Sequence, residues 1–311
     1  MKLKTLLYLF TLAFLWGIAF LFVKVAVRDI PPLTLVAARL VLAAVILFAI
    51  LRAQGRSLPP FGSIWMHFTV TGFLHNAAPY ALLAWGQQYI DSALAAMFIG
   101  AVPLITMLLA HIFTADDHFT PAKVTGGVIG FGGLLVLLAP GLLAGVQVTT
   151  LGLLAALVAA ICYGSAVVYT KITLQGQPPL VAPTAQLTTA AIFVIPIALL
   201  VDRPYTLPLP SLMPLASVLL LSVLSTSLAF YIYYRAMEIT SATTLAVSTY
   251  LVPIVATLMG VLILGERLTW NGYVGFALVL LGVLTVNGLF ARFTSRRPVK
   301  AERRPRTISV H

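Results

Sequence analysis

Long apolar runs, separated by short stretches that contain proline, glycine or charge, dominate the sequence. A helix needs about 20 apolar residues to cross the hydrocarbon core of a bilayer. Ten segments reach this length: 5–27, 33–52, 64–86, 92–113, 121–143, 150–173, 180–201, 212–236, 242–264 and 270–291. Lipid offers backbone polar groups no partner, so each run is predicted to be helical. The pattern predicts an all-α integral membrane protein with ten transmembrane helices.

Aromatic, charged and proline positions recur half a chain later. One set of pairs lies 147 residues apart: Trp16 and Tyr163, Gly17 and Gly164, Lys24 and Lys171, Pro31 and Pro178, and Arg39 and Gln186. Further pairs lie 149 or 150 residues apart: Trp85 and Tyr234, Ser92 and Ser241, Pro103 and Pro253, Gly126 and Gly275, and Gly133 and Gly282. This period is far longer than that of a solenoid, so the sequence predicts one domain made of two halves. The expected halves are 1–143 and 150–291, followed by a basic tail at 292–311.

Each predicted half contains five transmembrane segments, which is an odd number. The second half therefore enters the membrane from the opposite side, and the two halves form inverted repeats. Inverted repeats can exchange conformations and so expose one midplane site alternately to each side of the membrane. The expected architecture is two inverted five-helix repeats around a central cavity. This arrangement favours a secondary transporter over a channel or an enzyme.

Composition limits the chemistry that the protein can perform. The chain of 311 residues is 60% hydrophobic and 9% charged, whereas soluble domains contain about 25% charged residues. The single cysteine, Cys162, excludes an internal disulfide framework, and no Cys or His cluster indicates a metal. The sequence has no P-loop, so ATP is not expected to drive the protein directly. His111 and Asp116 have the spacing of an acyltransferase motif but straddle the end of a segment. We therefore expect neither an enzyme nor a bound cofactor.

The net charge of +11 is concentrated near the C-terminus, where seven Lys and Arg lie in the last twenty residues. A basic flank after an apolar span marks the cytoplasmic side of a membrane rather than a nucleic-acid site. Placing both termini in the cytoplasm puts 14 of the 19 Lys and Arg on that side and four outside, with Arg39 inside a segment. The sequence predicts a monomeric, multi-pass protein of the bacterial inner membrane. Loops 28–32 and 202–211 are predicted to face the periplasm.

Polar residues in the middle of apolar segments are the first candidates for a substrate site. His75 and Asn76 lie near the centre of segment 64–86, and Tyr80 follows Asn76 by four residues on the same helix face. Arg39 lies about 9 Å along its helix from the helix start. Ionisable groups at such depth indicate function, and Arg39 is a candidate to bind a substrate carboxylate. The alternatives are polar bonds between helices and, for Arg39, snorkelling or bonds to carbonyls.

Aromatic and hydroxyl side chains complete the predicted substrate site. Trp16 and Phe20 are one helical turn apart, and with Tyr163 and Tyr231 they offer apolar rings, most of them with a polar group. Ser225 lies in the middle of its segment, at a depth comparable with that of Asn76. For the rings, the alternatives are ordinary packing and interfacial belts. For Ser225, the alternative is a bond to a carbonyl of the preceding turn.

Three charged residues are assigned structural roles. Lys24 and Lys171 lie at opposite membrane faces in the inverted arrangement, and both are predicted to anchor their helices at the interface. Glu266 directly follows an apolar segment, and it is predicted to cap or tie the turn that follows it.

Several short motifs occur in a characteristic order. The second half carries Tyr234-x-Ala236, Ser241-Ala242, Pro253, Leu264-Gly265-Glu266-Arg267-Leu268-Thr269, Gly275 and Gly282, and the first half carries Trp16-Gly17, Lys24 and Arg39. In this order the chain resembles the drug/metabolite transporter superfamily in its ten-helix EamA-type form. Within the superfamily it is most similar to the YddG-type exporters of aromatic and other amino acids. The first segment lacks the glutamate of the four-helix multidrug members, so coupling through such a residue is not expected.

The resemblance implies an exporter of amino acids and similar small metabolites. The residues favour the same substrates, because no segment contains the buried carboxylate that a lipophilic cation needs, and phosphate esters need several clustered cations. A lining of rings, amides and hydroxyls discriminates weakly between side chains, so the specificity is predicted to be broad. The alternatives are a passive, channel-like facilitator and an exporter of other metabolites or drugs.

Overall fold

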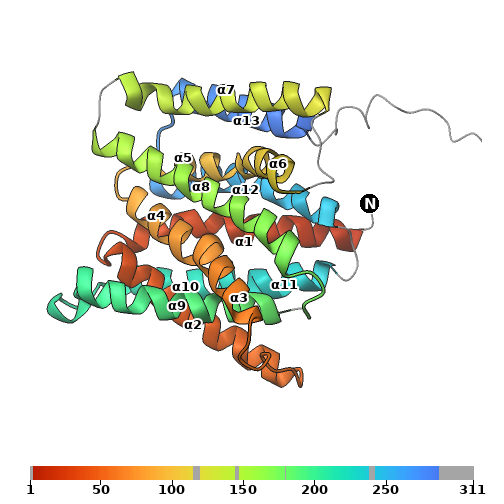
Figure 1. The fold of residues 1–311 in the computed structure, drawn as a ribbon. Helices are drawn as coiled ribbons and strands as arrows, with labels where there is room; N and C mark the ends of the chain where they lie inside the picture. Colours follow the sequence, from red (N-terminus) through yellow and green to blue (C-terminus); the bar gives the residue numbers. More distant parts are fainter. Residues whose placement is uncertain (1–2, 115–119, 144–146, 179, 238–241, 287–311) are drawn as a thin grey trace, which may run out of the picture.

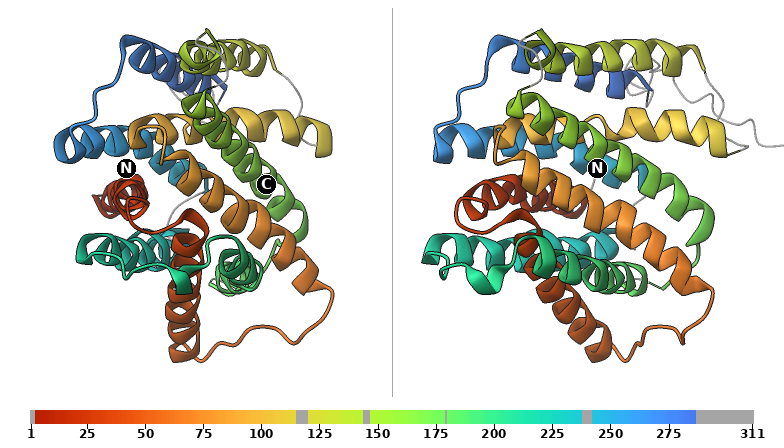
Figure 2. Two further views of the ribbon diagram at one scale, coloured as in Figure 1. Left: turned by 90° about the vertical axis from the view of Figure 1, so that its left-hand side faces the viewer. Right: turned by 60° about the vertical axis from the view of Figure 1, so that its left-hand side comes forward.

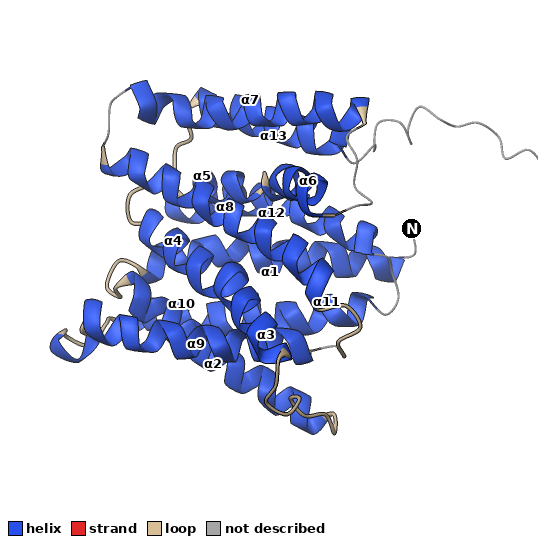
Figure 3. Cartoon of the chain, viewed as in Figure 1, coloured by secondary structure: helices blue, strands red, loops and turns tan. Residues whose placement is uncertain are grey.

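The structure, a computed structural model, describes residues 3–114, 120–143, 147–178, 180–237 and 242–286 of the chain. The regular structure of these residues is entirely helical (Figure 3). The first half contains α1 (Leu3–Ala26), α2 (Pro32–Ala53), α3 (Ile64–Gly72), η1 (Phe73–Ala77), α4 (Ala78–Gly86), α5 (Ser92–Ile99), α6 (Val102–Phe113) and α7 (Pro121–Leu143). The second half contains α8 (Val148–Thr173), α9 (Val181–Val201), η2 (Pro204–Thr206), α10 (Leu212–Ser222), η3 (Val223–Leu228), α11 (Ala229–Met237), α12 (Ala242–Leu264) and α13 (Trp270–Val286). The prediction of an all-α fold is confirmed.

Within the described ranges, seven helical segments are long and apolar enough to cross a membrane. Two shorter apolar helices, Ser248–Leu264 and Trp270–Val286, and the run from α3 to α4 complete the ten predicted segments. One predicted segment, 92–113, is divided between α5 and α6. Pro103 lies in the first turn of α6 and has no N–H with which to continue the hydrogen bonds of α5. The chain is a multi-pass membrane protein with the expected ten-helix arrangement.

The helices of the two halves are interleaved in one bundle (Figures 1 and 2). α1 packs against α10 and α12, and α2 packs against α9. α1 begins at the end of the bundle where the N-terminus lies, whereas α8 begins at the opposite end (Figure 1). α7 and α13 lie side by side at one edge of the bundle. The two halves therefore enter the bundle from opposite ends.

Glycines bring α7 and α13 into close contact. A Cβ atom on Gly126 would lie 2.6 Å from the carbonyl oxygen of Gly282, and one on Gly133 would lie 2.6 Å from that of Gly275. These distances leave no space for a side chain, so the two helices touch through their backbones, as small residues allow in membrane helices. The four glycines recur between the halves of the sequence. The crossing is therefore formed by glycines at corresponding positions of the two predicted halves.

α3 and α10 each continue into a single turn of π-helix. η1 begins at Phe73 and η3 begins at Val223, which lie 150 residues apart. In η3 the hydroxyl of Thr226 donates to the carbonyl oxygen of Leu221, five residues earlier, at 3.0 Å. A π-turn inserts one additional residue into a helix and frequently lies at a functional site. The third and eighth predicted segments are therefore interrupted at matching depths.

At one end of the bundle, carboxylates in two loops accept hydrogen bonds from residues at the starts of two helices. We call this end the acid-capped end (left in Figure 1). Asp29, after α1, accepts hydrogen bonds from the backbone N–H and the hydroxyl of Ser211, at 3.1 and 2.5 Å. Asp202, after α9, accepts hydrogen bonds from the backbone N–H and the hydroxyl of Thr34, at 2.7 and 2.9 Å. The loops 54–63 and 174–178 lie at the opposite end. Each carboxylate therefore caps a helix that belongs to the other half of the chain.

Glu266 and Lys24 make further contacts at the acid-capped end. Glu266 accepts hydrogen bonds from the backbone N–H and the hydroxyl of Ser92, at 2.8 and 2.9 Å. It therefore caps the start of α5, and the prediction that it caps the turn after it is wrong. Lys24 donates to the carbonyl oxygens of Gln87 and Ile90, each at 2.7 Å. Lys24 thereby fixes α1 to the end of α4, and its role as an interfacial anchor stays a prediction.

Candidate substrate site

The face of α2 that carries Arg39 is turned into the core. Leu35 and Leu40 on this helix are at most 1% exposed, and Arg39 itself is only 7% exposed. The Nε atom of Arg39 donates a hydrogen bond to the hydroxyl of Thr226 at 2.9 Å. Its Cζ atom lies 3.6 Å from the centre of the Tyr80 ring, which is a cation–π contact. Arg39 therefore joins α2 to α4 in its own half and to η3 in the other half.

A group of rings lies beside Arg39. The His75 ring meets the Tyr163 ring edge to face, with 5.4 Å between ring centres, and lies 6.4 Å from the Phe230 ring. Tyr163 and Phe230 pack against the hydrophobic core that contains Tyr80. The rings come from η1, α8 and α11, so both halves contribute. Together these side chains form one group, which we call the central cluster: Arg39, His75, Tyr80, Tyr163, Thr226 and Phe230.

Two buried polar side chains on the π-turns have no hydrogen-bond partner among the residues that the structure describes. Asn76 in η1 is 0% exposed, and neither atom of its amide group is bonded. Ser225 in η3 is 1% exposed, and its hydroxyl is also unbonded. A buried polar group without a partner costs about 1–3 kcal/mol. Both groups can therefore gain stability from a polar ligand that reaches the π-turns.

The structure brings together four of the nine residues predicted for the site, namely Arg39, His75, Tyr80 and Tyr163. Two more, Asn76 and Ser225, lie on the π-turns that carry His75 and Thr226. The other three, Trp16, Phe20 and Tyr231, lie outside the central cluster. The Trp16 ring pairs with Tyr233 at 5.8 Å, and Phe20 is buried in a hydrophobic core with Leu83. Tyr231 packs against the core that contains Tyr80. Substrate binding by these three stays a prediction.

Thr226 and Phe230 belong to the central cluster, although neither is among the residues predicted for the site. The start of η3 follows the start of η1 by 150 residues, and this offset pairs Asn76 with Thr226 and Tyr80 with Phe230. Both residues therefore occupy positions whose counterparts in the first half were predicted. The repeat, read at the offset of 150 residues, is the signal that would have identified them.

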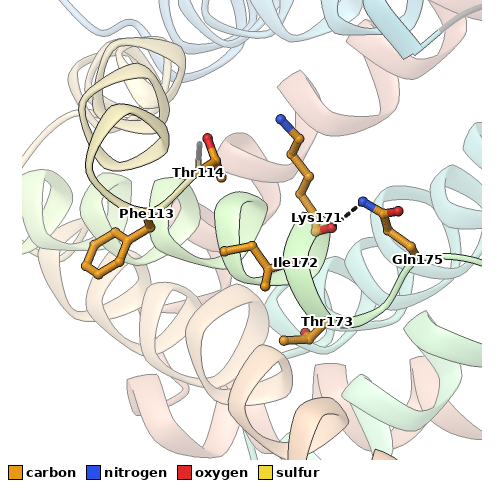
Figure 4. Close-up of a pocket in the computed structure, with 6 residues that line it drawn as sticks. All are labelled: Phe113, Thr114, Lys171, Ile172, Thr173 and Gln175. Carbon is orange, nitrogen blue, oxygen red and sulfur yellow. Dashed lines mark hydrogen bonds between the residues drawn. The ribbon is translucent and has the colours of Figure 1, made fainter. Parts of the chain in front are cut away.

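A pocket of about 360 Å³ lies away from the central cluster, at the end of the bundle opposite the acid-capped end. It is formed where α6 and α8 end, and Figure 4 shows the amine of Lys171 and the hydroxyl of Thr114 extending to the same side. Its other lining residues are Phe113, Ile172, Thr173 and Gln175. Among the described residues, His, Cys, Asp and Glu form no group of three or more that could hold a metal ion.

The chain belongs to the EamA-like transporter family, whose model matches residues 3–139 and again residues 150–288. It is 25% identical to an uncharacterized transporter of Bacillus subtilis, YoaV, over 93% of this chain and 98% of that protein. It is also 25% identical to YedA of Escherichia coli, an uncharacterized inner membrane transporter, over 89% of both chains. Protein PecM of Dickeya dadantii is 26% identical over 79% of this chain and 81% of its own.

A solved crystal structure of another protein has the same fold. It superposes with a TM-score of 0.65 at 22% sequence identity and covers 93% of this chain and 99% of the other. The predicted superfamily and the ten-helix fold are confirmed by these comparisons. The narrower similarity to YddG-type exporters stays a prediction.

Proposed function

We propose that this protein is a secondary transporter of amino acids and similar small zwitterions, with broad specificity, and that it works by alternating access. The central cluster between the two halves is its substrate site. Membership of a transporter family supports the general class, and the likeness to an inner membrane transporter supports the bacterial inner membrane. Export, rather than uptake, follows the resemblance to YddG-type exporters.

The surroundings of Arg39 are the observation that carries this proposal. Arg39 is 7% exposed, and its contacts are a neutral hydroxyl and a neutral ring. The acidic residues that the structure describes make their hydrogen bonds at the acid-capped end, and none of them bonds Arg39. Burying a charge without an opposite charge is costly, whereas a carboxylate can accept two parallel hydrogen bonds from a guanidinium. A solute carboxylate therefore stabilises Arg39 in a way that its protein neighbours do not.

The neighbours of Arg39 suit the remainder of a small zwitterion. The rings of His75, Tyr163 and Phe230 offer apolar surface to a side chain. The unbonded groups of Asn76 and Ser225 offer acceptors to an ammonium group. Ring surfaces distinguish poorly between apolar side chains, since one methylene group changes binding by about 1–3 kcal/mol. Broad specificity follows from this lining.

Competition in liposomes tests the proposed carboxylate contact. Purified protein in liposomes is expected to take up labelled phenylalanine, threonine or methionine faster than empty vesicles do. Unlabelled phenylalanine is expected to compete at least about tenfold better than phenylalaninamide, because hydrogen bonds to charged groups contribute about 1.5–3 kcal/mol. Equal competition by the acid and the amide contradicts a carboxylate site. Robust transport of a nucleotide-sugar or a quaternary ammonium drug, with no uptake of the three amino acids, contradicts the substrate class.

Counterflow distinguishes a carrier from a passive facilitator. Liposomes loaded with unlabelled substrate are expected to accumulate labelled substrate transiently above equilibrium, because a carrier exchanges its occupied site between the two sides. A pore equilibrates the label without this overshoot. Failure of counterflow together with unsaturable uptake contradicts alternating access.

We also propose that both termini are cytoplasmic, so that the acid-capped end faces the periplasm. The excess of Lys and Arg on the side of the termini supports this orientation. Single cysteines placed in loops 28–32 and 202–211 of a Cys162→Ser protein are expected to react with an impermeant reagent from the periplasmic side. Labelling of both loops from the cytoplasmic side alone reverses the orientation.

A further inference from the structure

The reciprocal contacts of Asp29 and Asp202 link the two halves of the chain. Asp29 follows α1 and bonds Ser211, the residue that precedes α10. Asp202 follows α9 and bonds Thr34 in the first turn of α2. The partners are 182 and 168 residues apart in sequence. Each half thus supplies a carboxylate to a helix start of the other half.

Both helices lack an equivalent cap of their own. The residue that precedes α2 is Pro31, whose side chain has no hydrogen-bond acceptor, and Ser211 makes no side-chain cap to its own helix. The first N–H groups of a helix have no partner within the helix, and a carboxylate there also interacts favourably with the helix dipole. Hydrogen bonds from the side chain and the backbone of Ser211 hold the pKa of Asp29 below its usual value, so Asp29 is a carboxylate at neutral pH.

The opposite end of the bundle has no acidic residue in the corresponding loops. Loops 54–63 and 174–180 contain neither Asp nor Glu. At the repeat offset of 147 residues, Gly176 takes the place of Asp29. The residue that directly follows α2 is Gln54, whereas the residue that directly follows α9 is Asp202. The caps formed by Asp29 and Asp202 between the halves are therefore found at one end of the bundle, and the corresponding loops at the other end have no acidic residue to form them.

The third carboxylate contact between the halves does not have this one-sided character. At the repeat offset of 149 residues, Glu266 corresponds to Asp117, and Ser92 corresponds to Ser241. The sequence therefore provides a carboxylate and a hydroxyl at both ends, although Asp117 and Ser241 lie outside the described residues. The difference between the ends rests on Asp29 and Asp202.

An inverted-repeat carrier alternates between two states in which its two ends exchange roles. With identical repeats the two states are equal in free energy, and a contact present at one end alone favours the state in which that end is closed. We propose that Asp29 and Asp202 form a reciprocal latch that holds the acid-capped end closed and makes the opposite end the open one at rest. The latch rests on the alternating access proposed above. The pocket beside Lys171 lies at the end that the latch leaves free to open.

Each half of the latch is an N-terminal cap. The loss of such a cap shifts an equilibrium by roughly two- to thirtyfold. Loss of both caps is therefore expected to raise the population open at the acid-capped end by at least about fivefold. Asparagine caps helices about as well as aspartate, so Asp→Asn substitutions are expected to retain most of the latch.

Two cysteine reporters at corresponding positions measure the opening of each end. Val27 and Leu174 lie 147 residues apart, just beyond α1 and α8, and they are 9% and 6% exposed. Val27→Cys and Leu174→Cys are introduced separately into the Cys162→Ser protein. The rate of maleimide labelling is measured in detergent without any solute. The measurement therefore tests the latch independently of transport.

In the Asp29→Ala/Asp202→Ala protein, labelling of Val27→Cys is expected to accelerate at least about fivefold while labelling of Leu174→Cys slows. The Asp29→Asn/Asp202→Asn protein is expected to stay within about twofold of the parent. Asp91→Ala is the matched control, because Asp91 lies at the same end but makes no side-chain cap. If the double alanine protein does not fold, Thr34→Val/Ser211→Ala removes the two hydroxyl donors instead and is expected to shift both rates in the same directions. Unchanged rates, or a parallel rise at both reporters, overturn the latch.

The outcome is separable from that of the proposed function. Loss of counterflow in the parent protein, with the reporter rates shifted as expected, overturns alternating access as the transport mode but leaves the one-sided closure in place. Intact counterflow with unshifted reporters overturns the latch alone.

Discussion

At the centre of the bundle the first half supplies an arginine and an imidazole, whereas the second half supplies neutral groups at the corresponding positions. The pairs are Arg39 and Gln186, His75 and Ser225, Asn76 and Thr226, and Tyr80 and Phe230. The backbone frame of the two halves is much more alike, since both carry a π-turn at the same depth and both carry the glycines of the α7–α13 crossing. Duplication has therefore kept the positions and diversified the chemistry. The two halves therefore present different side chains to the centre of the bundle.

Substitutions at Arg39 and Gln186 are expected to have the largest effect, because they remove or reverse the difference in charge between the two halves. Arg39→Gln gives both halves a glutamine and is expected to lower the apparent affinity for an amino acid by about thirtyfold or more, since removing one partner of a buried charge pair costs about 2–5 kcal/mol. Arg39→Gln/Gln186→Arg restores the charge in the wrong half and is expected to stay as weak, because Thr226 and Tyr80 are arranged around position 39. Uptake into liposomes provides the measurement, with Arg203→Gln in an exposed loop as the control. Recovery of uptake in the exchanged protein contradicts the assignment.

The glycine crossing, where the halves agree, is expected to be the most sensitive to added volume. A Cβ atom on Gly282 would lie 2.5 Å from the carbonyl oxygen of Gly126. Gly282→Ala is therefore expected to destabilise the protein by about 1–3 kcal/mol, as overpacking does. Gly132→Ala on the same pair of helices is the control, because a Cβ atom there meets nothing within 4 Å. Thermal unfolding in detergent compares the two, and equal midpoints would rule out backbone contact at this crossing.

Tyr80 differs from its counterpart Phe230 by one hydroxyl group, and substitutions at Tyr80 separate the role of its ring from that of its hydroxyl. Tyr80→Phe keeps the ring face that Arg39 covers and is expected to leave substrate affinity within about twofold, whereas Tyr80→Leu removes a cation–π contact of about 0.5–2 kcal/mol. The leucine variant is therefore expected to bind about two- to thirtyfold more weakly. Affinity measured by uptake at several substrate concentrations tests this order. A larger loss in the phenylalanine variant would show that the hydroxyl, not the ring face, is required.

Asn76 provides the smallest but most diagnostic change. Its amide has no hydrogen-bond partner in the described part of the chain, so Asn76→Ala is expected to reduce uptake several-fold without lowering the unfolding temperature. Thr189→Val is the matched control in the same part of the bundle, because the Thr189 hydroxyl donates to the carbonyl oxygen of Gln186 at 3.1 Å. The control is expected to lose about 0.5–1.5 kcal/mol of stability and to keep its uptake. The reverse pattern makes Asn76 a structural residue.

Much of the fold follows from the sequence because its signals are long. A run of about 20 apolar residues can satisfy its backbone in lipid only as a helix. The repeat that includes Trp16, Lys24 and Arg39 extends over many residues, so its matches are too many to be explained by chance. The depth of Arg39, His75 and Tyr80 follows from the same segments. The structure brings Arg39 into contact with the ring of Tyr80, and the role of these side chains in a substrate site stays a prediction.

Contacts within the site depend on helix rotation, which the sequence does not reveal. One additional residue in a helix rotates everything after it by about 100°. Apolar periodicity does not show such an insertion in a segment that is apolar on all sides. Ser225 was consequently predicted for the site, whereas its neighbour Thr226 bonds Arg39. Glu266 shows a different limit, since its partner Ser92 lies 174 residues earlier and no local pattern connects them.

The matched π-turns also record the order of events in the history of this chain. An additional residue inside a membrane helix arises by insertion. Two independent insertions at the same depth of corresponding helices would explain the shared π-turns poorly. The simplest history has a single insertion in an ancestral five-helix unit, which duplication then copied. Arg39 and Gln186, which lie 147 residues apart and differ in charge, diverged after that event. The irregular turn is therefore older than the difference in chemistry that it now supports.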